Sequence, residues 1–99
     1  MAVGVQLEFR GASLDSYDQI NEIIGGLPGG PAANHELFHW VTPTDGGFRV
    51  IDVWESEEAF DRFLRERLEP VFEEAGILAP PEIEIFPVYN YAVGARWRG

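Results

Sequence analysis

Apolar and polar side chains alternate at the start of the chain, where Val3, Val5, Leu7 and Phe9 are separated by Gly, Gln and Glu. A period of two places one side of a β-strand against a core, so residues 3–9 are expected to form a half-buried strand. The spacing then becomes helical, with apolar side chains at Tyr17, Ile20, Ile23 and Ile24. Ser13 is the expected N-cap of this helix, which must end before the glycine- and proline-rich residues 25–31.

Two runs rich in aromatic and β-branched residues, 35–42 and 48–54, flank the dipeptide Asp45-Gly46. Asp-Gly between such runs is typical of a β-hairpin. Ser56 is the expected N-cap of a long helix, because acidic residues at positions 57 and 58 suit the positive end of a helix dipole. Since a proline interrupts an α-helix, Pro70 is expected to start a short second helix that ends near Gly76. Residues 82–88 alternate again as a fourth strand.

The predicted order of elements, strand–helix–strand–strand–helix–strand, is that of a ferredoxin-like α+β domain. With right-handed crossovers, the four strands form an antiparallel sheet in the order 4-1-3-2, and both helices cover one face of it. No linker divides the chain, so we expect one domain over residues 1–99, with a core in 2–88 and a tail in 89–99. The tail either crosses to a partner subunit, with Trp97 as an anchor, or frays.

Matching the apolar registers of the four strands assigns side chains to the two faces of the sheet. The face under the helices is expected to carry Val3, Val5, Leu7, Phe38, Trp40, Ile51, Val53, Ile83 and Ile85. The opposite face is expected to carry Gln6, Glu8, Leu37, His39, Val50, Asp52, Trp54, Glu84 and Phe86. This second face is aromatic and polar at once, so we expect a second copy of the sheet to dock on it around a ligand cavity. A one-residue slip of the hairpin would exchange His39 for Trp40 in that cavity.

The chain's two histidines lie in the sequence HELFH, residues 35–39, which fits the H-E-x-x-H pattern of zinc proteases. That chemistry needs a helix, because residues i and i+4 then lie one turn apart and bind one ion. The segment is short, lies between two prolines and leads into the hairpin, so a strand is expected and a helix capped by Asn34 is disfavoured. On a strand the two imidazoles are roughly 13 Å apart. No metal site of the zinc-protease type is therefore expected.

His39 and Asp52 are the candidate catalytic residues. The predicted hairpin places His39 across from Val50 and diagonal to Asp52 on the cavity face. A carboxylate beside an imidazole fixes its tautomer and raises its pKa, which suits a general base or a hydrogen-bond donor to a ligand. The alternative is a structural polar pair at a subunit interface, since an unpaired carboxylate on a central strand is expensive to bury. His35, at the entry of the strand, is expected to be exposed.

The overall charge of the chain excludes some classes of binding partner. Seventeen acidic residues against seven basic ones give a net charge of −10. All the basic residues are arginines, and a chain this acidic lacks the basic surface that binds nucleic acid or an anionic membrane. The absence of cysteine excludes thiolate nucleophiles and cysteine-ligated metals. Neither a signal peptide nor an apolar run of about 20 residues is present, so a soluble cytoplasmic protein is expected.

The element order and the sequence DVWESEEAFDRF, residues 52–63, resemble the dimeric α/β-barrel superfamily. Within it, the chain is most similar to the small antibiotic biosynthesis monooxygenase-like proteins, over residues 2–90. The resemblance implies a homodimer, but not one activity, because the superfamily includes quinol monooxygenases, heme-degrading enzymes, dehydratases and isomerases. Heme-degrading relatives carry a heme-binding histidine where this chain has Phe63, so heme is not expected. The cofactor-independent oxygenases of the superfamily imply that no cofactor is needed.

These observations predict a homodimer that binds a small molecule, and whether it catalyses a reaction stays open. If it is an enzyme, the resemblance favours cofactor-independent oxidation of an aromatic or polyketide-like substrate. His39 is then base or hydrogen-bond donor and Asp52 its orienting partner. The expected ligand-binding residues are Gln6, Glu8, Leu37, Val50, Trp54 and Phe86, with Trp54 and Phe86 as an aromatic wall. The alternatives are a non-catalytic ligand-binding or dimerisation module, an isomerase or dehydratase, and a metal bridged between subunits by His35 or His39.

Overall fold

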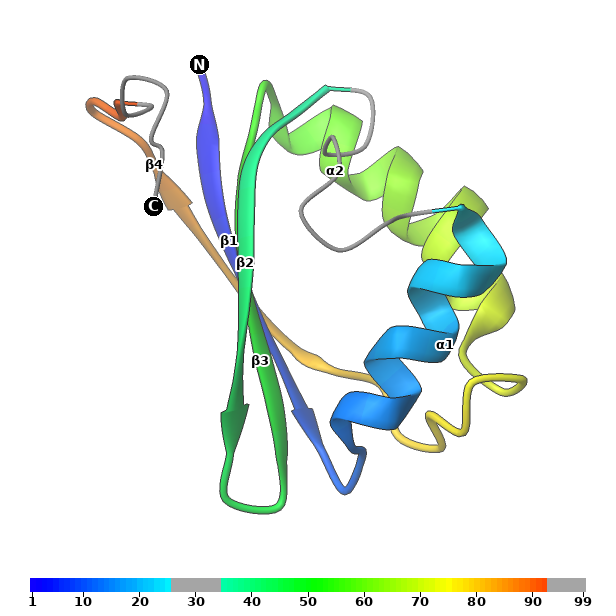
Figure 1. The fold of residues 1–99 in the computed structure, drawn as a ribbon. Coiled ribbons are helices and arrows are strands. Elements are labelled where there is room, and N and C mark those ends of the chain that lie inside the picture. Colours follow the sequence, from blue (N-terminus) through cyan, green and yellow to red (C-terminus); the bar gives the residue numbers. More distant parts are fainter. Residues whose placement is uncertain (26–34, 93–99) are drawn as a thin grey trace, which may run out of the picture.

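The computed structural model describes residues 1–25 and 35–92. Its four strands are β1 (Val3–Arg10), β2 (Glu36–Thr44), β3 (Gly47–Trp54) and β4 (Glu82–Pro87). Helix α1 (Leu14–Ile24) follows β1, and α2 (Glu57–Phe63) follows β3 (Figure 1). The order of elements is therefore the predicted one. The expected loop at 26–31, Asn34 and the end of the tail with Trp97 lie outside the described residues.

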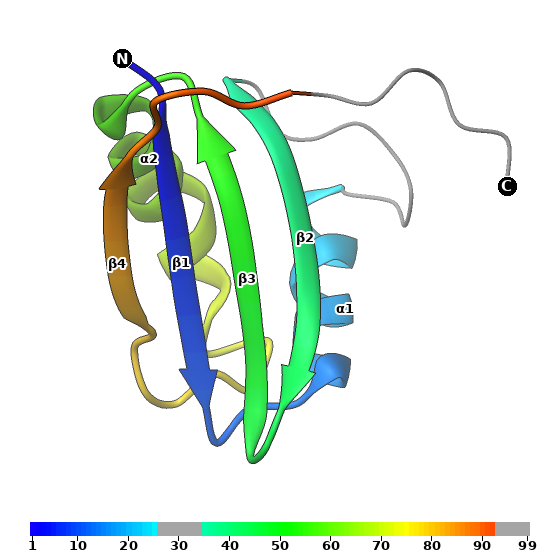
Figure 2. The ribbon, with the colours of Figure 1, turned by 90° about the vertical axis from the view of Figure 1, so that its left-hand side faces the viewer.

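The strands form one antiparallel sheet in the order β2-β3-β1-β4, which Figure 2 shows face-on. Both helices lie on the same side of this sheet, and the other side carries no helix (Figure 1). The predicted ferredoxin-like α+β fold, its strand order and its one-sided helix layer are thus confirmed. We call the uncovered side of the sheet the open face.

The hydrophobic core lies between the sheet and the two helices. Phe9 of β1 stacks on Phe48 of β3 with ring centroids 4.6 Å apart. Trp54, at the end of β3, is fully buried and packs edge-on against Phe60 of α2, with centroids 5.8 Å apart. Burying such large aromatic rings supplies much of the hydrophobic stabilisation of a domain this small.

The second helix begins as the sequence predicts and ends differently. The Ser56 hydroxyl accepts a hydrogen bond of 3.1 Å from the Ala59 N–H, so Ser56 is the N-cap. Beyond α2 the chain continues as a π-helical segment, η1 (Leu64–Leu68), and a 3₁₀ segment, η2 (Glu69–Val71). The expected short helix from Pro70 to Gly76 is wrong, because only turns follow η2. Pro70 removes one N–H and clashes with the preceding turn, which favours such irregular hydrogen bonding.

The hairpin lies on the sheet with its faces exchanged relative to the prediction. Val5 of β1 lies opposite Asp52, and Val3 lies opposite Trp54. Residues directly opposite in an antiparallel pair share a face, so Asp52 and Trp54 lie under the helices together with Val5. His39 lies there too, and it is paired directly with Asp52 and not, as expected, with Val50, whose partner is Val41.

The expected positions of the hairpin residues are therefore corrected. His39, Val50, Asp52 and Trp54 do not lie on the open face, and Phe38, Trp40, Ile51 and Val53 do not lie under the helices. The predictions for β1 and β4 are confirmed. The helix side carries Val3, Val5, Leu7, Ile83 and Ile85, and the open face carries Gln6, Glu8, Glu84 and Phe86. Both hairpin strands carry apolar residues on both sides, so their patterns alone did not distinguish the faces.

Candidate functional site

A chain of hydrogen bonds joins the sheet to the first helix. His39 Nδ1 lies 3.1 Å from Asp52 Oδ1 on the neighbouring strand. The Trp54 indole N–H donates to the other oxygen of the same carboxylate, Oδ2, over 3.1 Å. The predicted catalytic pair is therefore in direct contact, and Trp54 contacts it through its N–H rather than as an aromatic wall.

Tyr17, on α1, contacts the other nitrogen of the His39 ring. Its hydroxyl oxygen lies 2.7 Å from Nε2, and the two rings stack at 20° with centroids 6.1 Å apart. The sequence placed Tyr17 only in the apolar stripe of the helix, so its role at this site was missed. A tyrosine in such a stripe was the one available signal, because its hydroxyl needs a polar partner when the ring is buried.

Glu36 also reaches the site, although a regular strand would point it the other way. Residues i and i+3 of a strand lie on opposite faces, but β2 is irregular between Glu36 and Phe38. Leu37 is the extra residue of this β-bulge, so Glu36 and His39 lie on the same side. Glu36 Oε2 is 3.5 Å from His39 Nδ1, and the Glu36 side chain is 8% exposed.

The two carboxylates control the charge on the imidazole. Hydrogen bonds to Asp52 and then to Glu36 raise the pKa of His39 to about 11, against an opposing effect of burial. Burial raises the pKa of Asp52 to about 6, although its hydrogen bond to His39 acts to lower it. At neutral pH the pair is therefore an imidazolium and a carboxylate. His39 is then a cationic hydrogen-bond donor, and of the two predicted roles the general base is the less favoured.

The imidazolium donates from both nitrogens, to Asp52 through Nδ1 and to the Tyr17 oxygen through Nε2. The Tyr17 hydroxyl proton then points away from His39 and is available to another acceptor. The His39 side chain is 31% exposed, whereas Asp52 is 6% exposed. Solvent therefore reaches the imidazole, whereas the carboxylate of Asp52 is shielded from it.

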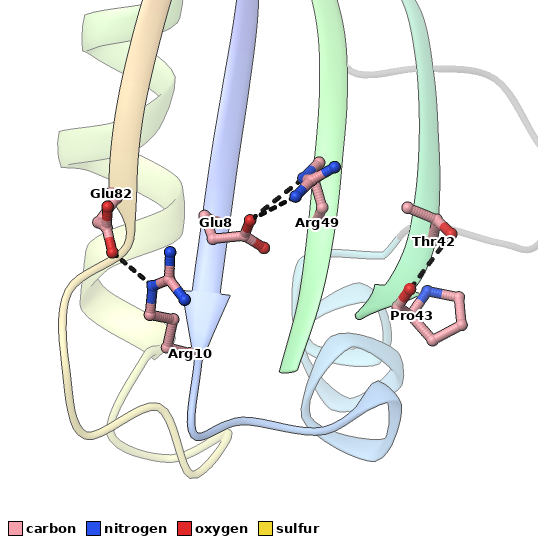
Figure 3. Close-up of polar contacts among 6 residues, drawn as sticks. All are labelled: Glu8, Arg10, Thr42, Pro43, Arg49 and Glu82. Carbon is pink, nitrogen blue, oxygen red and sulfur yellow. Dashed lines mark hydrogen bonds and ion pairs between the residues drawn. The ribbon is translucent and has the colours of Figure 1, made fainter. Parts of the chain in front are cut away.

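The remaining predicted site residues do not join this cluster. Val50 is buried on the helix side, and Leu37 is half-buried at the bulge. Gln6, Glu8 and Phe86 lie on the open face, where Glu8 forms an ion pair of 2.7 Å with Arg49 (Figure 3). The residues expected to line one cavity thus lie on two different faces of the sheet.

Two other features lie apart from the cluster. His35 is exposed, as predicted, and its Nδ1 contacts Glu55 Oε2 at 2.7 Å. An open hollow of about 720 Å³ lies around the β2–β3 turn and the start of α1. Its lining residues are Gly11, Ala12, Ser13, Leu14, Asp15, Ser16, Pro43, Gly46, Gly47 and Gly76. It therefore includes neither His39 nor Asp52.

No protein-family model matches the sequence, and no curated protein is a significant match. Solved structures do share the fold. A proposed antibiotic biosynthesis monooxygenase from Chloroflexus aurantiacus J-10-fl is 18% identical, with 95% of this chain and 100% of that chain covered and a TM-score of 0.61. A conserved protein from Methanosarcina mazei Go1 is 12% identical, with 87% and 91% covered and a TM-score of 0.60.

A third structure is SnoaB, a cofactor-independent oxygenase from Streptomyces nogalater. It is 16% identical, with 91% of this chain and 93% of that chain covered and a TM-score of 0.55. The fold is therefore that of the antibiotic biosynthesis monooxygenase-like proteins. Within residues 1–25 and 35–92, no helix has the length and apolar character needed to span a bilayer.

Proposed function

We propose that the protein is a homodimeric, cofactor-independent monooxygenase that oxidises an aromatic, polyketide-like substrate beside Tyr17 and His39. The observation that carries the proposal is the hydrogen-bonded chain Asp52–His39–Tyr17, which is buried at the carboxylate and open to solvent at the imidazole. Its fold is shared with a cofactor-independent oxygenase, which supports the reaction class by analogy.

The chemistry balances without a bound cofactor when the substrate is an electron-rich phenol. A phenol that loses its O–H hydrogen and one ring C–H hydrogen to O₂ becomes a quinone and releases one water. One oxygen atom enters the ring and the other leaves as water, and the substrate supplies all four electrons. The protein then has to bind the ring, favour its phenolate and stabilise the negative charge that passes to oxygen.

The described residues suit these tasks. The Tyr17 hydroxyl donates to the substrate oxygen, and the His39 imidazolium behind it stabilises the phenolate. Asp52 holds the imidazolium in place, and the Trp54 N–H holds Asp52. The phenolic proton leaves to the solvent that reaches His39.

The test is oxygen consumption by the metal-free protein with a panel of hydroquinones and naphthols. We expect incorporation of one ¹⁸O atom from ¹⁸O₂ into the product. Tyr17→Phe and His39→Gln should each lower kcat/KM by roughly 10²-fold, the usual effect of losing one charge-stabilising donor. His35→Gln removes the exposed imidazole and should leave the rate unchanged. Equal rates in all four proteins would reject the assignment.

The homodimer is proposed from the open face. Phe38, Trp40 and Phe86 lie there and are 47%, 47% and 48% exposed. An exposed cluster of large apolar side chains on a sheet usually marks a protein interface, and a second copy of the same face is the simplest partner. Trp40→Glu should convert the dimer to a monomer in analytical ultracentrifugation. Leu78→Glu is the control, because Leu78 is 91% exposed in a loop and outside this face.

The same open face favours the alternative function, a non-catalytic ligand-binding or dimerisation module. Several predicted ligand-binding residues lie there rather than at the His39 cluster. If the protein is a dimer that oxidises no member of the panel, this alternative is the better description.

A further inference from the structure

We propose that Glu36, His39 and Asp52 form a binding site for a divalent first-row transition cation. This site differs from the zinc-protease site that HELFH would form as a helix. It uses one histidine and the glutamate of that motif, together with a residue of the next strand. β2 and β3 lie side by side in the sheet (Figure 2), so the three ligands come from two neighbouring, hydrogen-bonded strands. The inference does not rest on the proposed oxygenase activity.

The distances fit a coordination sphere. One ligand atom from each of the three side chains lies within 4.8 Å of the other two. His39 Nδ1 is 3.1 Å from Asp52 Oδ1 and 3.5 Å from Glu36 Oε2. Ligands bound at roughly 2.0–2.2 Å from one ion are about 3.0–3.5 Å from each other. Only a small closure is needed, and three protein ligands leave open positions for water or a substrate.

The surroundings of the cluster resemble the outer shell of a metal site. A histidine that binds a metal usually forms a hydrogen bond through its other nitrogen, and a binding carboxylate is held in the same way. Tyr17 contacts His39 Nε2, and Trp54 donates to Asp52 Oδ2. In each case the held atom is the one that faces away from the cluster. Nδ1 and Oδ1 are thereby left facing each other and Glu36.

The charge of the cluster also favours a cation. Glu36 and Asp52 side chains are 8% and 6% exposed, so two carboxylates converge where water is largely excluded. A single imidazolium leaves the three side chains with a formal charge of −1. A divalent cation with a neutral imidazole makes the sum zero, which lowers the cost of burial. One His nitrogen and two carboxylate oxygens suit Mn²⁺, Fe²⁺, Co²⁺ and Zn²⁺.

Cation and proton compete for the same lone pair, on His39 Nδ1. Binding of the cation therefore releases the proton of the imidazolium to the buffer and breaks the direct His39–Asp52 hydrogen bond. Tyr17 keeps its partner, because the metal-bound neutral imidazole still carries a proton on Nε2.

The experiment is calorimetric titration of the chelator-treated full chain with MnCl₂ and ZnCl₂, with the visible absorption of bound Co²⁺ as a second readout. We expect one equivalent per chain. Glu36→Gln, which keeps the shape of the side chain, should weaken binding at least 10-fold. Tyr17→Phe, which removes only the outer-shell contact, should weaken it roughly 10- to 100-fold. His35→Gln is the matched control and should bind as the wild type does.

Three results would overturn the proposal: no saturable binding with a dissociation constant below about 100 µM, equal affinity in the Glu36→Gln variant, or loss of binding in His35→Gln. The last would place the ion on the exposed His35–Glu55 pair. Circular dichroism of each variant confirms that it is folded. The oxygenase assay is run in chelator, so its failure is separate from the failure of this proposal.

Discussion

The raised pKa of His39 predicts an unusual loss of stability in mild alkali. The pKa of His39 is about 11 in the folded protein, against an ordinary pKa of 6.5 for histidine. The folded state therefore holds its proton more tightly than the unfolded state. This contribution to the free energy of unfolding is fully present below pH 6.5 and is lost as the pH rises toward 11.

The size of the stability loss depends on the pH range over which it is measured. Between pH 7.5 and 9, the unfolded imidazole is neutral and the folded one is still protonated. The free energy of unfolding then falls by about 1.4 kcal/mol per pH unit, or roughly 2 kcal/mol over the window. Because the side chain is 31% exposed, solvent screening reduces this to about 1–2 kcal/mol. The other groups contribute little to the pH dependence of stability in this window, since the chain contains no lysine and no cysteine.

The assay is urea unfolding at three pH values in this window, in chelator, for the wild type and His39→Gln. The difference between the two proteins isolates His39, because every other titrating group is common to both. His35→Gln keeps the buried pair and should follow the wild type. Parallel pH dependences for the wild type and His39→Gln would refute the reasoning.

Two further predictions concern the fold. Phe60→Ala should lower the free energy of unfolding by about 3–5 kcal/mol in urea titration, because the ring is 1% exposed, whereas Leu78→Ala, at a site 91% exposed, should change it by less than about 0.5 kcal/mol. Gly47→Ala should destabilise the protein more than Gly46→Ala, since a Cβ at position 47 collides with the Phe9 carbonyl and one at position 46 meets only the strain of a positive φ. Thermal unfolding of both glycine variants would show the order, and a reversed order would contradict it.

The topology could be predicted because each element has its own local signal. The alternation at residues 3–9, the Asp45-Gly46 turn and the Ser56 cap are all short-range features, and right-handed crossovers then allow few arrangements. The proximity of His39 and Asp52 could likewise be predicted, because any hairpin closed at this turn brings their strands together. The predicted register was wrong by two residues, since Asp52 and not Val50 lies opposite His39.

The sequence did not determine which side of the hairpin packs under the helices. That choice depends on how β3 pairs with β1, and a helix and a loop separate the two in the sequence. Leu37 and Phe38, or Val50 and Ile51, are adjacent apolar residues that suit either face. Tyr17 was missed because its contact with the sheet depends on the same choice. Such ambiguity is resolved only by packing against the helices.

The bulge at Leu37 has a consequence for recognising this site in other chains. Two residues of β2, Glu36 and Leu37, lie opposite the single residue Trp54. A chain one residue shorter here would form a regular ladder and still present its glutamate beside the histidine, because the residue next to Phe38 would then pair with Trp54. A length change of one residue is therefore neutral for the convergence of the two side chains. The same convergence is therefore compatible with either E-x-x-H or E-x-H, and a search with one fixed spacing recovers only one of the two.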